Sequence, residues 1–79
     1  MSRTVGADTL TDVELQSFAD AIDAFRASPI APGMLHSAPA RDDAGRFCEV
    51  YFYSDSAGQH PLAVVRIDER GKPGKVEKL

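Results

Sequence analysis

Hydrophobic and polar residues alternate with two different periods along this chain of 79 residues. Between residues 10 and 27, large apolar residues recur at steps of three and four, which predicts one amphipathic helix. From residue 34 onward, apolar runs of strand length are separated by polar turns, which predicts a sheet. The fold class we expect is α+β with two layers, in which one N-terminal helix packs on an antiparallel meander of three to four strands.

The predicted helix has clear boundaries. Thr11 is a suitable N-cap, Glu14 follows at the spacing of a capping box, and Pro29 limits the C-terminal end. We expect the sheet to be contacted by the stripe of large apolar residues Leu15, Phe18, Ile22 and Phe25. An adjoining polar flank consists of Asp12, Gln16, Asp20 and Asp23. The back of the helix is then formed by the smaller residues Val13, Ser17, Ala21 and Ala24.

One turn motif, Asp-x-x-Gly, occurs three times at a spacing of 13 residues, at 42–45, 55–58 and 68–71. The Asp side chain accepts from backbone N–H groups later in such a turn, and Gly adopts a positive φ without steric cost. We therefore expect positive φ at Gly45, Gly58 and Gly71. Because Gly58 joins the two inner strands, it should be the most sensitive to substitution. The predicted strands are 34–40, 46–54 and 61–67, and residues 72–79 form either a final strand or a tail.

The remaining segments complete a single domain over residues 1–79. Residues 1–9 show no periodicity and are expected to form a flexible arm, and residues 28–33 form a proline-rich connector. Pro39 and Pro73 fall in the first and last predicted strands, where a missing N–H group is tolerated at a sheet edge.

The register of the two inner strands remains open by one residue. With a short turn at Gly58, Val50 pairs with Val64 and Phe52 with Leu62, whereas one more turn residue pairs the faces differently. In either register both faces carry large apolar side chains, and one helix covers only one of them. We expect the second face to be covered by the N-terminal arm, a second copy or another protein, with a homodimer when no partner is present.

Composition and charge exclude several classes of protein. A hydrophobic fraction of 43% and a charged fraction of 27% are ordinary for a globular chain, and the net charge is −3. The single cysteine excludes an internal disulfide. No segment reaches the roughly 18 apolar residues of a membrane span, and the N-terminus has no apolar signal segment. We therefore expect a cytoplasmic protein without membrane association.

The residues that could carry chemistry are Cys48, His36 and His60. Cys48 lies in an apolar strand, where a cysteine is typically a small core residue. His60 is expected in a solvated loop, and His36 either at the surface or partly packed on an edge strand. The spacing of these residues fits no zinc site, and the isolated glycines do not form a phosphate-binding loop. We expect neither an enzyme nor a bound metal or cofactor.

The pattern instead favours a small, non-catalytic protein-binding module, most concretely an inhibitor or regulator of a larger protein assembly. Its partner-binding residues would be Tyr51 and Tyr53, with Asp12, Asp20 and Asp23 attracting a basic partner surface. The alternative is a homodimer that binds nucleic acid or a small ligand, because aromatic side chains on an open sheet can stack on bases. Glu49 between the tyrosines and the negative net charge oppose nucleic-acid binding.

Two family resemblances extend this interpretation. The helix, Pro32-Gly33 and the strands with Glu49-Val50-Tyr51, Val64-Val65-Arg66-Ile67-Asp68 and Gly74-Lys75-Val76 resemble PepSY-type domains. That resemblance implies regulation of a protease, usually outside the cytoplasm. In size and composition the chain is also similar to small phage or mobile-element inhibitors such as anti-CRISPR proteins, which implies inhibition of a protein assembly.

Overall fold

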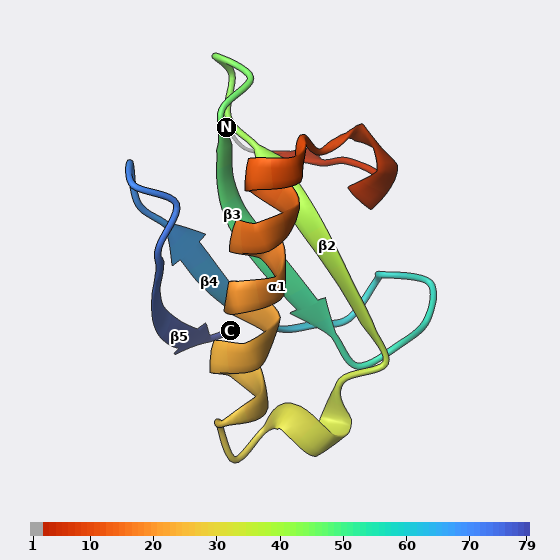
Figure 1. Cartoon of the computed structure of the whole chain (residues 1–79). Helices are drawn as coiled ribbons and strands as arrows, with labels where there is room; N and C mark the ends of the chain where they lie inside the picture. The colour runs from red at the N-terminus through yellow and green to blue at the C-terminus, as the bar shows by residue number, and fades with distance from the viewer. Residues whose placement is uncertain (1–2) are drawn as a thin grey trace.

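The computed structural model describes residues 3–79 and arranges them in two layers (Figure 1). The elements in chain order are β1 (Arg3–Thr4), η1 (Ala7–Thr9), α1 (Asp12–Arg26), η2 (Ala31–Gly33), β2 (His36–Arg41), β3 (Phe47–Tyr53), β4 (Pro61–Ile67) and β5 (Pro73–Lys78). The strands form one sheet in the order β1-β2-β3-β4-β5, and every neighbouring pair is antiparallel. The predicted α+β fold class is confirmed, with five strands in place of three to four.

The additional strand corrects the expectation of a flexible arm over residues 1–9. Arg3 and Thr4 pair with the last residues of β2, and the Val5 N–H group donates to the Pro39 carbonyl at 2.9 Å. The 3-10 turn η1 follows at Ala7–Thr9. A strand of two residues is too short for its alternation to be visible in a sequence. Met1 and Ser2 lie outside the described residues.

The three Asp-x-x-Gly turns are confirmed, because Gly45, Gly58 and Gly71 have φ values of 84°, 73° and 79°. In the β4–β5 turn the Gly71 N–H group donates to the Asp68 carbonyl at 3.0 Å. The Asp68 carboxylate also accepts from two later backbone N–H groups of this turn. The 42–45 turn repeats this arrangement. The middle loop is longer, since the Ser54 N–H group donates to the His60 carbonyl at 2.9 Å.

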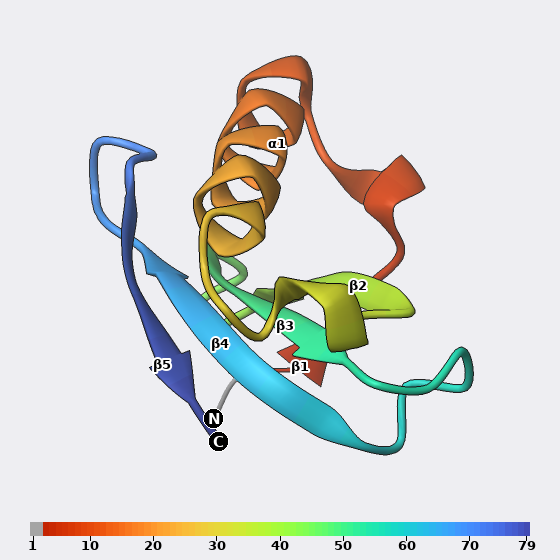
Figure 2. The ribbon, with the colours of Figure 1, turned by 90° about the horizontal axis from the view of Figure 1, so that it is seen from below.

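This longer loop decides the register that the sequence left open. Val50 pairs with Val65 and Phe52 with Ala63, so the register with the short turn is wrong. The paired side chains enter the core beneath α1, together with η2 on the same side of the sheet (Figure 2). At the centre of this core the rings of Phe25 and Phe52 stack in parallel with centroids 4.0 Å apart.

The helix starts as predicted, but it packs on the sheet with a different face. Thr11 and Glu14 form both hydrogen bonds of the capping box. Leu15, expected in the buried stripe, is 40% exposed, whereas Ser17 and Ala21 are 6% and 0% exposed. The prediction of a small-residue back is therefore wrong at these two positions. Small side chains let the helix axis approach the sheet closely, and the larger Leu15 remains at the rim.

One ion pair, which no local pattern in the sequence predicts, connects the start of the helix to the sheet. The Arg41 guanidinium of β2 donates to both carboxylate oxygens of Glu14 at 2.8 Å, and also to the carbonyls of Thr9 and Gly45. The Arg41 hydrogen bond, followed by the one from the Thr11 backbone, lowers the pKa of Glu14 from 4.5 to about 2. A two-point contact of this kind fixes orientation as well as distance.

Candidate protein-interaction face

The sheet surface opposite α1 carries no helix or 3-10 turn of residues 3–79 (Figure 2). We call this surface the outer face. Strand pairing places His36 beside Tyr53, Tyr51 beside Val64, and Glu49 beside Arg66. Its larger side chains come from four adjacent strands and are His36, Glu49, Tyr51, Tyr53, Arg66, Lys75 and Glu77. This surface has aromatic and charged groups in separate rows.

The aromatic row consists of three rings. The centroids of His36 and Tyr53 are 5.6 Å apart with an interplanar angle of 29°, and those of Tyr53 and Tyr51 are 6.4 Å apart at 30°. The Tyr51 hydroxyl donates to a Glu49 carboxylate oxygen at 3.3 Å. Each ring therefore restricts its neighbour, and the row is ordered in the isolated chain.

The charged row runs across β3, β4 and β5. The Arg66 guanidinium lies between two acids, 3.5 Å from a Glu49 oxygen and 3.3 Å from a Glu77 oxygen. The Arg66 side chain is 67% exposed, that of Glu77 44% and that of Glu49 15%. Exposed pairs of this kind contribute at most about 1 kcal/mol to stability. Their more important effect is to hold three charged groups in a defined position on the surface.

The apolar residues of the outer face are small and already covered. Ala38, Ala40 and Val64 are 8%, 0% and 5% exposed. Val50 and Phe52, the largest apolar residues of β3 besides Phe47, are buried under α1 and 0% exposed. The expectation of a second face rich in large, uncovered apolar side chains is therefore wrong, because the larger apolar residues of β3 and β4 point toward the helix.

The two tyrosines differ in how much of each a partner could contact. Tyr53 is 9% exposed, and burial is the main cause that raises the pKa of its hydroxyl, followed by Tyr51 and Asp55. Tyr51 is half-buried. Of the two predicted aromatic contacts, Tyr51 is thus the one with the more accessible ring, while Tyr53 mainly supports it.

The predicted acidic residues lie in the other layer. Asp12 and Asp23 are exposed on α1, and Asp20 is half-buried and accepts from the Gln16 amide at 3.0 Å. Asp12 and Asp20 border a shallow hollow that also includes Arg70 and Lys72 of the β4–β5 turn. Since α1 covers the face opposite the tyrosines, the acids and the tyrosines do not form one continuous surface (Figure 2).

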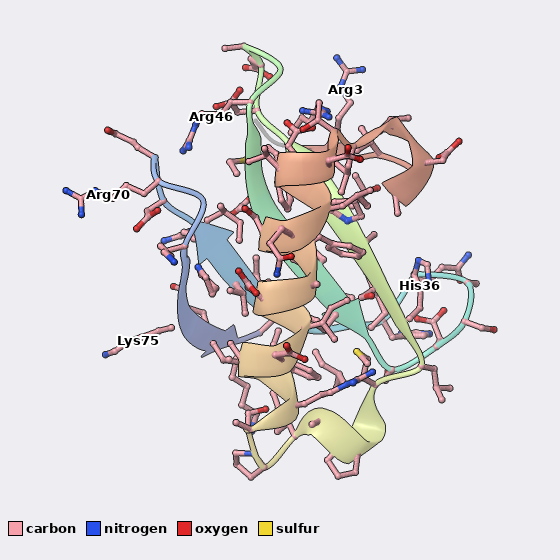
Figure 3. All side chains as sticks on the ribbon, viewed as in Figure 1. Arg3, His36, Arg46, Arg70 and Lys75 are labelled. Atoms are coloured by element: carbon pink, nitrogen blue, oxygen red, sulfur yellow. The ribbon has the colours of Figure 1, made fainter. Side chains whose placement is uncertain are left out.

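A second hollow of about 200 Å³ lies between the start of α1 and two sheet turns. Arg46 and Arg70 extend from these turns at its border (Figure 3). Val13, which is 77% exposed, forms part of its wall. The Arg46 guanidinium forms an ion pair with the Asp42 carboxylate at 3.8 Å, and Glu69 lies next to Arg70 in the wall of the hollow. This hollow therefore has charged groups of both signs.

The residues considered for catalysis are dispersed. Cys48 is half-buried, and its pKa is raised by burial first and then by Glu49 and Asp42, which disfavours a thiolate. His36 stacks on Tyr53, whereas His60 is exposed in the β3–β4 loop. No group of three metal-binding side chains occurs among residues 3–79.

Comparisons with known protein families, curated proteins and solved structures find no match. The resemblances to PepSY-type domains and to small phage inhibitors therefore stay predictions. Within residues 3–79 no helix has the length and apolar character needed to cross a membrane. The sequence predicted only part of the outer face, namely Tyr51 and Tyr53. His36 and Arg66 also lie on this face, and their place there follows from the strand register, which the sequence left open.

Proposed function

We propose that this chain is a small, non-catalytic protein-binding module that contacts a basic surface of another protein through its outer face. Its most concrete role is that of an inhibitor or regulator that occupies a surface of a larger assembly. The observation that carries this proposal is the ordered aromatic row of His36, Tyr53 and Tyr51 beside the charged row around Arg66.

Side chains of the outer face that have fixed neighbours before binding favour a contact with another protein. Tyr, His and Arg side chains supply large contact areas, and aromatic residues and Arg are enriched in protein interfaces. Each rotamer-rich side chain that becomes fixed on binding costs about 0.5–1.5 kcal/mol. Tyr51 and Arg66 already have defined neighbours at 3.3–3.5 Å in the isolated chain, so less of this cost remains.

The net charge of the chain suits a basic partner. On the outer face the carboxylates of Glu49 and Glu77 flank the guanidinium of Arg66, and the exposed Lys75 of β5 shares the face of Glu77. The net charge of the chain is −3, and the exposed Asp23 on the other layer adds to attraction at longer range. Such charges mainly raise the association rate, and groups in direct contact mainly determine the dissociation rate.

A second candidate function is binding of single-stranded nucleic acid, because Tyr51 and Arg66 lie on the same face of the sheet, opposite α1. Two observations weigh against it. Tyr53 is 9% exposed, which leaves little of its ring for stacking, and Glu49 and Glu77 would repel phosphates. A gel-shift titration with random single-stranded DNA and RNA at about 150 mM salt distinguishes the two functions. Low-micromolar retention of the oligonucleotides would replace protein binding by nucleic-acid binding.

Two charge reversals on opposite layers test the proposed contact surface. The immobilised chain first captures proteins from the soluble extract of its source cells, and the captured partner is then measured kinetically. Glu49→Lys and Asp23→Lys change the net charge equally, so both should slow association to a similar extent. Only Glu49→Lys should also accelerate dissociation, by about tenfold or more, because Glu49 lies on the outer face. Circular dichroism confirms that both variants are folded.

Tyr51→Ala provides the matching test of the aromatic row and should accelerate dissociation as well. Equal dissociation rates for the wild type, Glu49→Lys and Tyr51→Ala would exclude the outer face as the contact surface. Faster dissociation of Asp23→Lys alone would assign the contact to α1 instead.

A further inference from the structure

Strand β5 forms an open edge of the sheet. It pairs with β4 on one side, and no element of residues 3–79 lies beyond it on the other (Figure 2). Gly74, Lys75, Glu77 and Lys78 are exposed, and Val76 is half-buried against the core. An edge of this kind presents backbone donors and acceptors to any strand that can pair with it.

The hydrogen bonds to β4 show which backbone groups of β5 are free for a further strand. The Leu79 N–H group donates to the Leu62 carbonyl of β4 at 2.9 Å. Because successive residues of a strand alternate in direction, Glu77 also points its backbone groups toward β4. Val76 and Lys78 therefore direct theirs away from the sheet, toward the open edge.

The charges of this strand are complementary to themselves in one register. If two β5 strands pair antiparallel around a two-fold axis at Val76, Lys75 of each copy lies opposite Glu77 of the other. These are the non-hydrogen-bonded positions, at which opposing side chains are closest. Moving the axis to position 75 brings the two Lys75 side chains together, and moving it to position 77 brings the two Glu77 side chains together. Charge therefore selects the register centred on Val76.

From this self-complementarity we infer that a second copy of this chain pairs along β5 and extends the sheet across the two copies. The partner in this contact is thus the chain itself, and the inference does not depend on the proposed function. Lysines on an edge strand usually prevent association because like charges meet. Here the register that pairs Val76 with itself replaces that repulsion by two attractions between Lys75 and Glu77.

The existing ion pairs support the same arrangement. The Arg66 guanidinium lies 3.3 Å from a Glu77 oxygen and 3.5 Å from a Glu49 oxygen, so it forms ion pairs with both carboxylates. Lys75 of the second copy would bring a further cation to Glu77. The charged rows of the two copies would then join into one continuous row across the interface. Between the pairs Val65–Val76 and Ile67–Pro73, β5 has one residue more than β4. The regular part of β5 that can pair with a second copy is therefore short, and the dimer should form only at high concentration.

Charge reversal in the purified chain tests this inference. Multi-angle light scattering of the wild type, from about 10 μM to 1 mM, should show the mass rising from 8.5 kDa toward twice that value. Lys75→Glu and Glu77→Lys each place like charges opposite one another and should weaken the dimer by about tenfold or more. An equimolar mixture of these two variants restores both attractions and should form a heterodimer about as stable as the wild-type dimer.

Lys78→Glu is the matched control, because position 78 lies opposite Gly74, which has no side chain. It changes the net charge as Lys75→Glu does but should leave the dimer nearly unchanged. Amide exchange at high concentration should slow at Val76 and Lys78 and not at Glu77. A wild type that remains at 8.5 kDa throughout overturns the inference. A dimer that is insensitive to Lys75→Glu and Glu77→Lys, or a mixture that stays monomeric, overturns it as well.

Discussion

Gly71 should be the most demanding of the three turn glycines, because two separate constraints act on it. Its φ of 79° lies in the left-handed region, and a Cβ atom placed on it would be 2.7 Å from the Ser17 hydroxyl oxygen of α1. Gly45 has the same type of φ, at 84°, but a Cβ atom there would meet nothing within 4 Å. The turns at Gly45 and Gly71 can therefore be compared directly, because they have the same backbone conformation and only the turn at Gly71 contacts the helix.

The magnitudes follow from these two constraints. Gly45→Ala should destabilise by about 1–2 kcal/mol, the cost of a left-handed conformation for a residue with a Cβ atom. Gly71→Ala carries the same cost and also displaces the Ser17 hydroxyl, which donates to the Val13 carbonyl at 3.3 Å. Losing that hydrogen bond adds about 1 kcal/mol. Gly71→Ala should therefore cost about 2–3 kcal/mol and lower the thermal midpoint about twice as far as Gly45→Ala.

A double-mutant cycle with Ser17→Ala isolates the contact with the helix. Without the hydroxyl, the closest remaining atom would be the Cβ of residue 17, at an ordinary distance of 3.9 Å. In this background Gly71→Ala should cost about as much as Gly45→Ala, which gives a coupling energy of about 1 kcal/mol. Urea unfolding of the four proteins in the cycle and of Gly45→Ala measures these differences.

Equal costs for Gly45→Ala and Gly71→Ala, or a coupling energy near zero, would refute the close approach of α1 to the β4–β5 turn. The position of Gly58 between the two inner strands predicts that it is the most sensitive glycine. The structure favours Gly71, since a Cβ atom at Gly58 would lie at an ordinary 3.5 Å from the His36 ring.

Two further predictions concern the ion pair and the outer face. Because Arg41 lowers the pKa of Glu14 from 4.5 to about 2, this stabilisation is complete above pH 4.5 and is lost as the pH falls toward 2. Glu14→Gln should cost about 1 kcal/mol at pH 7 and flatten the decline of stability over this range, whereas an unchanged slope in acid unfolding would contradict the linkage. Tyr53→Ala should destabilise by about 3 kcal/mol and Tyr51→Ala by about 1 kcal/mol, because only Tyr53 is buried. Equal shifts of the thermal midpoint would show that the two rings do not differ in their structural roles.

Local signals in the sequence were sufficient for several parts of this structure. The capping box at Thr11 and the positive φ of the turn glycines depend on residues within a few positions of one another. Side chains of Thr and Asp satisfy nearby backbone N–H groups, and Gly alone has no Cβ atom to oppose a positive φ. For the same reason the order of the strands from residue 34 onward could be predicted, although their number was left at three or four.

The face of α1 that packs on the sheet was decided by tertiary contacts. Apolar periodicity favoured a stripe containing Leu15, but Ser17 and Ala21 are the deeply buried positions. Their small side chains allow a close approach to the sheet, and Ser17 also approaches Gly71, a residue that is distant in the chain. Strand β1 likewise exists because β2 offers backbone partners to Arg3 and Thr4.

The candidate site shows the same division most clearly. The sequence by itself indicated that Tyr51 and Tyr53 share a face, because a strand alternates with a period of two. The sequence did not determine whether the face with the two tyrosines lies under α1. One residue more or less in the 54–60 loop changes the register of β3 and β4, and with it the β4 residues that accompany the tyrosines. The folded chain turned Val50 and Phe52 toward Phe25 and placed Tyr51 and Arg66 on the face opposite α1. Only packing of the whole core could make that choice.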